Sequence, residues 1–379
     1  MDVKNLKIFL TGDNHLGLKY LNHKNSQIMI EERIKTFERM VKVANEEGCN
    51  LFVIAGDLFE STRGISKKDI KRLLDILAKF EEKIVILPGN HDFYEKETQV
   101  WKYMEDLLPS YDNILLLNEY KPYSMEIDDR KTILYPAFCS SKHSKPGENN
   151  LGWIKQQEMP DDDIIRIGIA HGSVEGETID NEKEYFFMNR EELNNINVDC
   201  WLLGHTHVPF PNNLSSEKFI EVGKIFNAGT HVQTDVNCNT EGLCFVIDID
   251  YCKKVRAKKI VTGKLHFYRK NIDVTGKSLS EALEELKSID DYSVVDVNLK
   301  GALDEDDYNN RDEVIEKYIG RFIEGTYNDH NISKMISLQL VEKEFAETSF
   351  SYAMLSDLLD EPKEAQLVYE LLQSLKEDK

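Results

Sequence analysis

The chain has 379 residues, enough for two domains, and 41% of them are hydrophobic, enough to fill real cores. No run approaches the roughly 18 apolar residues of a membrane span, and the first residues, MDVKNLKIFL, are too short and polar for a signal peptide. The six cysteines are scattered without a C-x-x-C pair, which argues against a zinc ribbon or a disulfide framework. We therefore expect a cytosolic protein with reduced cysteines and no membrane partner.

From residue 6 to about 205, short apolar runs alternate with amphipathic stretches. The first run, LKIFLTG, is followed by Ile30, Ile34, Phe37, Val41 and Ala44 at helical spacing, up to Gly48. Further strands are predicted at LFVIAG, KIVILPG, KTILYPA, IIRIGIAHG and VDCWLLGHTH, and further helices at KKDIKRLLDILAKF and VWKYMEDLL. Strands that alternate with helices favour a layered α/β domain.

After residue 240 the pattern changes. The segments GLCFVIDID, KKVRAKKIV and HFYRKNIDV read as strands that edge or close the first domain. A small α+β module follows, with helices at SLSEALEELKS and RDEVIEKYIGRFI and strands at YSVVDVNLKG and KMISLQLVE. The last segment has leucines at helical spacing, interrupted at Pro362. We expect a domain at 1–262, an α+β domain at 263–345 and a helical tail at 346–379.

Side chains that bind metals follow almost every strand of the first domain. They are Asp13 and His15, Asp57, then Asn90, His91 and Asp92, then His171, and finally His205 and His207. In layered α/β folds the carboxyl ends of the strands share one rim, so these groups should converge there. Each motif alone is more often a turn or a hydrogen-bonded core residue. The occurrence of all these motifs together, in this order, is not expected by chance.

The donor types indicate the chemistry. Carboxylates, an amide oxygen and several imidazoles suit manganese, iron or zinc, and are too rich in nitrogen for calcium or magnesium. Seven donors exceed what one tetrahedral ion needs, which predicts two ions with a carboxylate between them. Two such ions clamp a phosphoryl group and deprotonate a water, which is the chemistry of phosphoester hydrolysis.

The motifs D-x-H, G-D, G-N-H-D, H and G-H-x-H, in that order, resemble those of the calcineurin-like metallophosphoesterases. Within them, DNHLG, GDLFE, LPGNHD and LLGHTH are most similar to the SbcD-type nuclease subunit of the double-strand-break repair complex. The segment HFYRKNIDVTGKSLSEALEEL, followed by YSVVDVNLKG, resembles the capping domain of that family. The resemblance implies a four-layer αββα core with a small α+β cap, and a manganese-dependent 3′-to-5′ exonuclease and single-strand endonuclease.

The resemblance also implies residue roles. Asp13, His15, Asp57 and His207 would hold one metal, and Asp57, Asn90, His171 and His205 the other, with Asp57 as the bridge. His91 would be free to face the scissile phosphate, and Asp92 would orient it, although a simple turn aspartate is nearly as good a reading. Ala228 departs from the pattern, because a proline is expected before Gly229. His23, His143, His231, His266 and His330 match no motif and read as surface or structural.

The formal net charge of −21 opposes a polyanionic partner, but KKVRAKKIVTGKLHFYRK, from Lys253 to Lys270, holds eight Lys or Arg and no acidic residue. We expect Lys258, Lys259 and Lys264 to contact DNA, with a solvated strand pair as an equal alternative. A homodimer through helices near 66–80 and 97–108 is expected from the resemblance and from the stripe of Val100, Tyr103, Met104 and Leu107, with packing of this stripe on the chain's own sheet as an equal alternative. An SbcC-type ATPase is implied as a partner, although the tail is short.

Two other functional classes use the same residues. A phosphomonoesterase or cyclic-nucleotide phosphodiesterase would have the same seven ligands, so only the cap and the basic segment favour DNA. A non-catalytic scaffold of the same fold should lack His91 or several ligands, and here all are present.

Overall fold

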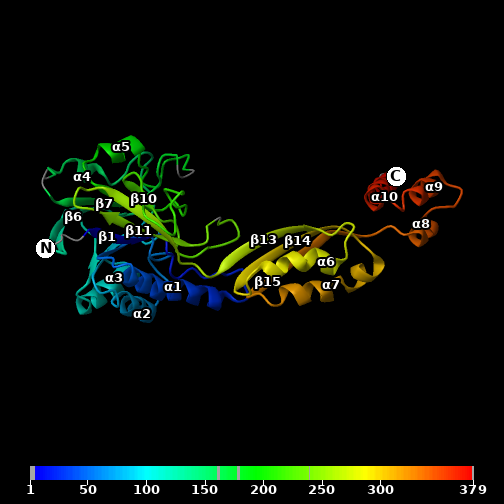
Figure 1. The fold of residues 1–379 in the computed structure, drawn as a ribbon, viewed down its shortest axis with the longest axis horizontal. Helices are drawn as coiled ribbons and strands as arrows, with labels where there is room; N and C mark the ends of the chain where they lie inside the picture. The colour runs from blue at the N-terminus through cyan, green and yellow to red at the C-terminus, as the bar shows by residue number, and fades with distance from the viewer. Residues whose placement is uncertain (1–4, 160–162, 177–179, 239, 378–379) are drawn as a thin grey trace. The chain divides into compact units, whose positions relative to one another are not determined.

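The computed structural model describes residues 5–159, 163–176, 180–238 and 240–377. The chain forms two compact units, Met1–Leu265 and His266–Lys379, which we describe separately (Figure 1). Within the described residues, no helix is both long and apolar enough to cross a membrane.

The first unit contains two mixed β-sheets. The larger sheet has the strand order β4-β3-β2-β1-β11-β12-β9, in which β1 to β4 are parallel and β11 runs antiparallel to β1. Its strands are β1 Leu6–Thr11, β2 Leu51–Ala55, β3 Lys83–Leu87, β4 Ile114–Leu116, β9 Ile220–Glu221, β11 Leu243–Ile249 and β12 Val255–Val261. The second sheet has the order β10-β8-β7-β6-β5. Its strands are β5 Tyr123–Ile127, β6 Arg130–Ala137, β7 Ile165–His171, β8 Cys200–Gly204 and β10 Ile225–Asn227.

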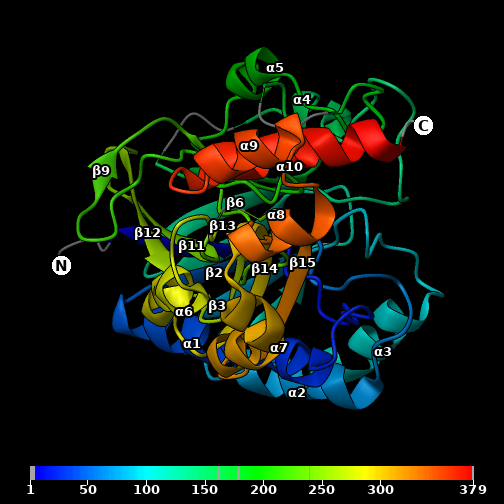
Figure 2. The ribbon, with the colours of Figure 1, turned by 90° about the vertical axis from the view of Figure 1, so that its right-hand side faces the viewer.

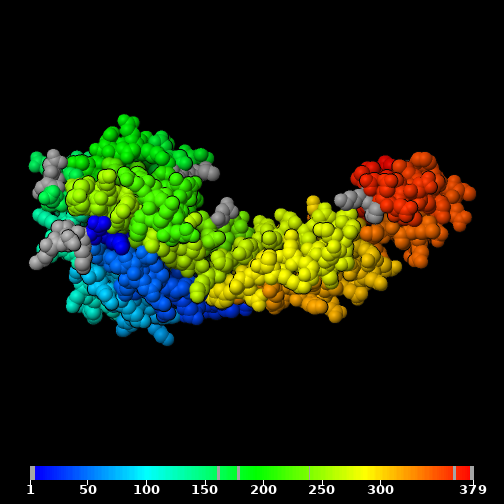
Figure 3. Space-filling model, in the orientation of Figure 1, coloured from blue at the N-terminus to red at the C-terminus, as the bar shows by residue number. Residues whose placement is uncertain are grey.

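Helices cover the outer face of each sheet. The helices α1 Ser26–Glu46, α2 Lys67–Leu77 and α3 Gln99–Leu107 lie on one side of the unit, and α4 Gly152–Lys155 and α5 Arg190–Asn195 on the other (Figures 1 and 2). The space-filling view shows α1 and α2 as neighbouring parts of one surface (Figure 3).

Three apolar cores hold these layers together. The first joins α1, α2 and α3 to the larger sheet, the second fills the space between the sheets, and the third lies under α4 and α5. Strands buried on both faces read as continuous apolar runs, which is why they were recognisable in the sequence. The prediction of an α/β domain with mixed sheets is confirmed.

The second unit has a parallel three-stranded sheet in the order β13-β14-β15, with β13 His266–Asp273, β14 Ser293–Leu303 and β15 Glu324–Lys334. The helices α6 Leu279–Leu283 and α7 Glu305–Ile319 pack on this sheet around one apolar core. Three further helices, α8 Leu338–Glu344, α9 Phe350–Asp357 and α10 Pro362–Glu377, share a small core of their own.

Two predictions that concern the second unit were wrong. The segment HFYRKNIDV was expected to edge or close the first domain, but it forms β13 and pairs with β14 in the second unit. We expected a strand at KMISLQLVE, but the strand ends at Lys334 and the helix α8 begins at Leu338. The Ser337 hydroxyl accepts a hydrogen bond from the Leu340 amide, which caps the helix and ends the extended backbone.

Candidate metal centre

The seven predicted ligands meet where strands of the two sheets end. Asp13 and His15 follow β1, Asp57 follows β2 and Asn90 follows β3, all in the larger sheet. His171 is the last residue of β7, and His205 and His207 follow β8, in the second sheet. Each sheet therefore supplies part of one buried cluster.

Three side chains gather on the β7 side of Asp57, and we call Asn90, His171 and His205 the His171 half. The Asn90 Oδ1 atom lies 3.0 Å from His171 Nε2 and 2.9 Å from His205 Nδ1. The Asp57 Oδ2 atom lies 3.2 Å from His171 Nε2. Four donor atoms thus face one small volume.

Three other side chains lie on the β1 side, and we call Asp13, His15 and His207 the His15 half. The Nε2 atoms of His15 and His207 are 2.9 Å apart, and Asp57 Oδ2 is 3.8 Å from His15 Nε2. Donor atoms of Asp13, His15 and His207 all lie within 4.8 Å of one another. Asp57 therefore faces both halves.

The donor spacing fits bound metal ions. Atoms that share one ion at about 2.0–2.2 Å lie roughly 3 Å from each other, and the separations in both halves are of that size. The donors are nitrogen and oxygen without a thiolate, which suits manganese, iron or zinc. The cluster is therefore consistent with a dimetal centre.

Groups outside the cluster fix the ring orientation of two ligand histidines. His171 Nδ1 donates to the carbonyl oxygen of Ala55 at 2.9 Å, so its Nε2 atom is left for a metal. His15 Nδ1 lies 3.0 Å from the Glu60 carboxylate, which leaves Nε2 toward His207. Glu60 was missed as a functional residue, although it ends the GDLFE motif.

The backbone around the centre is unusual. Asp13, His15, Asp57, His205 and His207 all have positive φ, between 45° and 102°, which non-glycine residues seldom adopt. Strained backbone of this kind persists where the surrounding structure enforces it.

Two glycines make room for the ligands. A Cβ atom at Gly56, whose φ is +90°, would stand 2.1 Å from His171 Nδ1. A Cβ atom at Gly89 would stand 2.2 Å from Asp57 Oδ1. Only glycine allows this approach of the β2 and β3 loops to the cluster.

His91 is not one of the seven predicted ligands, but a donor atom of its ring lies within 4.8 Å of donor atoms of His15 and Asp57, so it borders the His15 half. Its backbone amide donates to Asp57 Oδ1 at 2.8 Å, and its ring is 35% exposed. The ring Nδ1 atom donates to the Glu60 carbonyl oxygen at 3.1 Å, which leaves Nε2 unengaged by that bond. The role of His91 as a free imidazole facing the phosphate stays a prediction.

Asp92 has a different role from the predicted one. Its carboxylate accepts hydrogen bonds from the amides of Gly89, at 2.7 Å, and Phe59, at 3.0 Å. It therefore joins the β2 and β3 loops, and the Glu60 carbonyl orients His91 instead. The turn reading of Asp92 was the better one.

In the cluster, the effect of burial on the pKa values is opposed by ion pairing. Burial would raise the pKa of Asp57, but the imidazoles of His171, His15 and His91 outweigh it and hold the pKa well below its usual range. Burial would lower the pKa of His171, but Asp57 and Asp13 raise it to about 9. Burial and the nearby His171 lower the pKa of His205 to about 4. Burial, with the Asp57 charge, raises the pKa of Asp92 to about 7.

An aromatic wall that the sequence did not reveal flanks the His171 half. The Tyr185 ring lies 5.2 Å from the His205 ring, and the His143 ring lies 4.9 Å from Tyr185. Tyr185 is held near the end of β7, because the Asp180 carboxylate accepts hydrogen bonds from the Ser173 hydroxyl and from the Tyr185 amide.

The predicted DNA-binding lysines differ in their surroundings. The Lys258 side chain is only 12% exposed and pairs with Glu47 at 2.7 Å. Lys259 is half-buried and Lys264 is exposed. The basic segment also spans the boundary between the two units at Leu265. Lys258 is therefore already engaged, while the other two remain candidates.

The apolar stripe that suggested a dimer packs inside the chain. Val100 and Met104 are fully buried, and Tyr103 and Leu107 pack against the same core. The stripe therefore no longer supports a dimer, and the homodimer stays a prediction.

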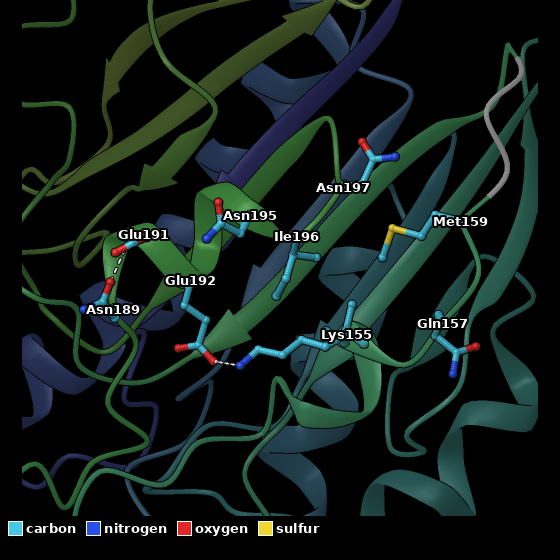
Figure 4. Close-up of a pocket in the computed structure, with 10 residues that line it drawn as sticks. Lys155, Gln157, Met159, Asn189, Glu191, Glu192, Asn195, Ile196 and Asn197 are labelled. Carbon is cyan, nitrogen blue, oxygen red and sulfur yellow. Dashed lines mark hydrogen bonds and ion pairs between the residues drawn. The ribbon is translucent and has the colours of Figure 1, made fainter.

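A hollow of about 600 Å³ lies elsewhere, between α4 and α5 (Figure 4). Asparagine and glutamate side chains line it, and Lys155 pairs there with Glu192 at 2.5 Å. None of the predicted ligands lines it.

A family model described as calcineurin-like phosphoesterase matches residues 6–209, more than half of the 379 residues. The chain belongs to this family. With the cluster of His and Asp donors described above, this makes it a metal-dependent phosphoesterase.

Solved structures give distant likenesses. The protein TT1561 of Thermus thermophilus is 11% identical over 67% of this chain and 98% of that chain, with a TM-score of 0.39. A dimetal phosphatase from Danio rerio is 11% identical over 67% and 98%, with a TM-score of 0.33. The nuclease MPE of Pseudomonas putida is 15% identical over 48% and 73%, with a TM-score of 0.23. These likenesses carry no argument about the substrate.

Proposed function

We propose that the chain is a manganese-dependent DNA nuclease that hydrolyses phosphodiester bonds as an exonuclease and a single-strand endonuclease. The observation that carries the hydrolytic part is Asp57, whose carboxylate faces two separate sets of donors. Asp13, His15, Asp57 and His207 would hold one ion, and Asp57, Asn90, His171 and His205 the other. Such ions supply a deprotonated water and offset charge on the phosphoryl oxygens.

The residues of the chain would divide the remaining work. With protons on both ring nitrogens, His91 would donate from Nε2 to the scissile phosphate and pass that proton to the departing oxygen, which leaves the neutral ring. The Glu60 carbonyl keeps the Nδ1 proton in place during this step, because a carbonyl oxygen can only accept. Tyr185 would offer a flat face beside the His171 half, on which a base or sugar can stack.

Three features favour DNA over a small phosphoester. The motifs of residues 11–207 resemble those of SbcD-type nucleases, as described above. The second unit resembles the capping domain of that family. Lys259, on β12, and Lys264 would contact DNA phosphates. A small-molecule phosphoesterase remains the alternative, and the intact donor set speaks against a scaffold.

The C-terminal helices would bind a partner. Phe350 and Met354 on α9, and Leu367, Leu371 and Leu375 on α10, are exposed and spaced by four residues. Residues four apart share one face of a helix, so each helix offers an apolar stripe. An SbcC-type ATPase with an apolar groove would fit such a stripe.

The test of the nuclease function compares three substrates with manganese: single-stranded DNA, duplex DNA and a nitrophenyl phosphate ester. We expect cleavage of both DNAs, and loss of it in Asp57→Ala. Efficient hydrolysis of the ester with no cleavage of DNA would contradict the nuclease and favour the alternative.

A charge-reversal pair tests the DNA contact. Lys259→Glu with Lys264→Glu should weaken DNA binding and flatten its salt dependence by about 0.9 log units per lost phosphate contact. The matched control is Lys83→Glu with Lys131→Glu, which changes the net charge equally at exposed positions where β3 and β6 begin. The salt dependence of DNA binding is measured by fluorescence anisotropy. Equal slopes in the two double variants would contradict the proposal that Lys259 and Lys264 contact DNA.

A further inference from the structure

The loop between β1 and α1 carries two ligands of the His15 half on strained backbone. Asp13 and His15 have φ of 49° and 45°, both in the left-handed region. The Asp13 and His15 amides donate to the carbonyl oxygens of Gly56 and Asp57, at 3.1 and 2.9 Å. These bonds fix the loop to the β2 loop through its amide groups.

The carbonyl group between the two ligands is held by an arginine. Arg33, on α1, is 1% exposed, and its Nε atom donates to the Asn14 carbonyl oxygen at 3.0 Å. Its Nη2 atom donates to the same oxygen, and its Nη1 atom donates to the Tyr20 hydroxyl at 3.1 Å. One guanidinium group thus forms hydrogen bonds with two residues of this loop, Asn14 and Tyr20.

Arg33 is itself held from behind. The His231 Nε2 atom donates to the backbone carbonyl of Arg33 at 3.1 Å, and His231 is completely buried. The His231 ring also packs against Phe37, one turn further along α1, with 5.3 Å between the ring centroids. These contacts with His231 therefore fix the backbone of α1 at the position from which the Arg33 side chain extends.

We propose that Arg33 is a positioning residue for the metal ion of the His15 half. The fork of Nε and Nη2 fixes the peptide between Asp13 and His15, and so fixes where both ligand side chains begin. A lysine at this position keeps a positive charge but offers no planar fork. This inference rests on the two-ion centre of the proposed function, but not on DNA as the substrate.

The proposal predicts an asymmetric effect. The His171 half is built on β7 and on the loops after β3 and β8, and the hydrogen bonds of the Arg33 guanidinium described above go to Asn14 and Tyr20. Removing the fork should therefore weaken one ion and spare the other. A residue that only stabilised the fold would weaken both ions together or neither.

The experiment is a Mn²⁺ titration of the full chain by isothermal calorimetry, with Arg33→Lys and Arg33→Met compared with the native protein. The matched control is Arg166→Lys. Arg166 is another buried arginine of the first unit, and it forms an ion pair with Asp199, with 3.0 Å between Nη2 and Oδ1. Neither residue belongs to the cluster. Loss of groups that orient metal ligands typically costs 10- to 100-fold in metal affinity. We expect a loss of that size at one site in both Arg33 variants, with the second site unchanged and both sites unchanged in Arg166→Lys.

Other outcomes overturn the proposal. Two unchanged sites in Arg33→Lys, or equal weakening of both sites, would show that the fork does not position the ion. Arg33→Lys keeps the charge and most of the volume, so it tests the idea even if Arg33→Met does not fold. Native protein that binds fewer than two ions would overturn the centre itself, and this result is distinct from failure to cleave DNA.

Discussion

The two halves of the centre use similar ligands but are built in different ways. In the His171 half, His171 is fully buried, belongs to a strand and is oriented by a main-chain carbonyl. In the His15 half, the ligands sit on left-handed backbone after strands, and Glu60, which is 35% exposed, orients His15. His171 is therefore oriented by the main chain, whereas the loop of Asp13 and His15 is held by backbone hydrogen bonds and also by the side chains of Arg33 and Glu60. Changes around the rim should act on the His15 half first.

The largest effect should come from Asp57, because it is the residue that both halves share. Asp57→Ala should remove both ions and abolish hydrolysis, whereas His15→Ala should mainly weaken one ion. Metal content after desalting, measured by mass spectrometry, distinguishes these results. Equal ion counts in the two variants would mean that Asp57 does not serve both halves.

The next effect concerns His91, which touches the centre but belongs to neither half. His91→Ala should retain both ions and lose about 100- to 10,000-fold in rate, the usual effect of removing a general acid or base. The check is kcat alongside the ion count. Near-native cleavage in a protein with two bound ions would show that His91 has no catalytic role.

A smaller and selective effect is expected at Glu60. Glu60→Gln removes the carboxylate from His15 Nδ1, which should weaken Mn²⁺ in the His15 half about 10- to 100-fold and leave the His171 half unchanged. A two-site Mn²⁺ titration measures this. If both sites weaken equally, the contrast between the two halves is lost.

The sequence was sufficient for the strands that border the cluster and for the gathering of its side chains, because both depend on local patterns. β1, β2, β3, β7 and β8 are apolar runs with Asp, Asn or His at their ends or shortly after them, and their carboxyl ends meet by topology. The partners of these ligands depend on tertiary packing instead. Nothing in the spacing of Glu60, Tyr185 or Arg33 shows that they contact His15, His205 or the Asn14 carbonyl.

The second unit shows a different limit. The strand β15 has the sequence EGTYNDHNISK, and most of its side chains are exposed or half-buried. Its polar residues give no apolar run, so the sequence pattern favoured the later segment KMISLQLVE. A polar strand beside a buried neighbour is stabilised by pairing, here with β14, and leaves little local signal.

The smallest effect on catalysis should come from Asp92, which lies beneath both halves and orients neither. Asp92→Asn turns one accepting oxygen into an NH₂ group facing the Gly89 or Phe59 amide, both of which need an acceptor. A buried donor left unpaired costs about 1 to 3 kcal/mol of stability. We therefore expect a lower melting temperature, two bound ions and a rate within a few-fold of native. A large fall in kcat at unchanged melting temperature would restore the rejected role, in which the Asp92 carboxylate orients His91. A fall in both would show that the loop junction it makes is needed to keep His91 in place.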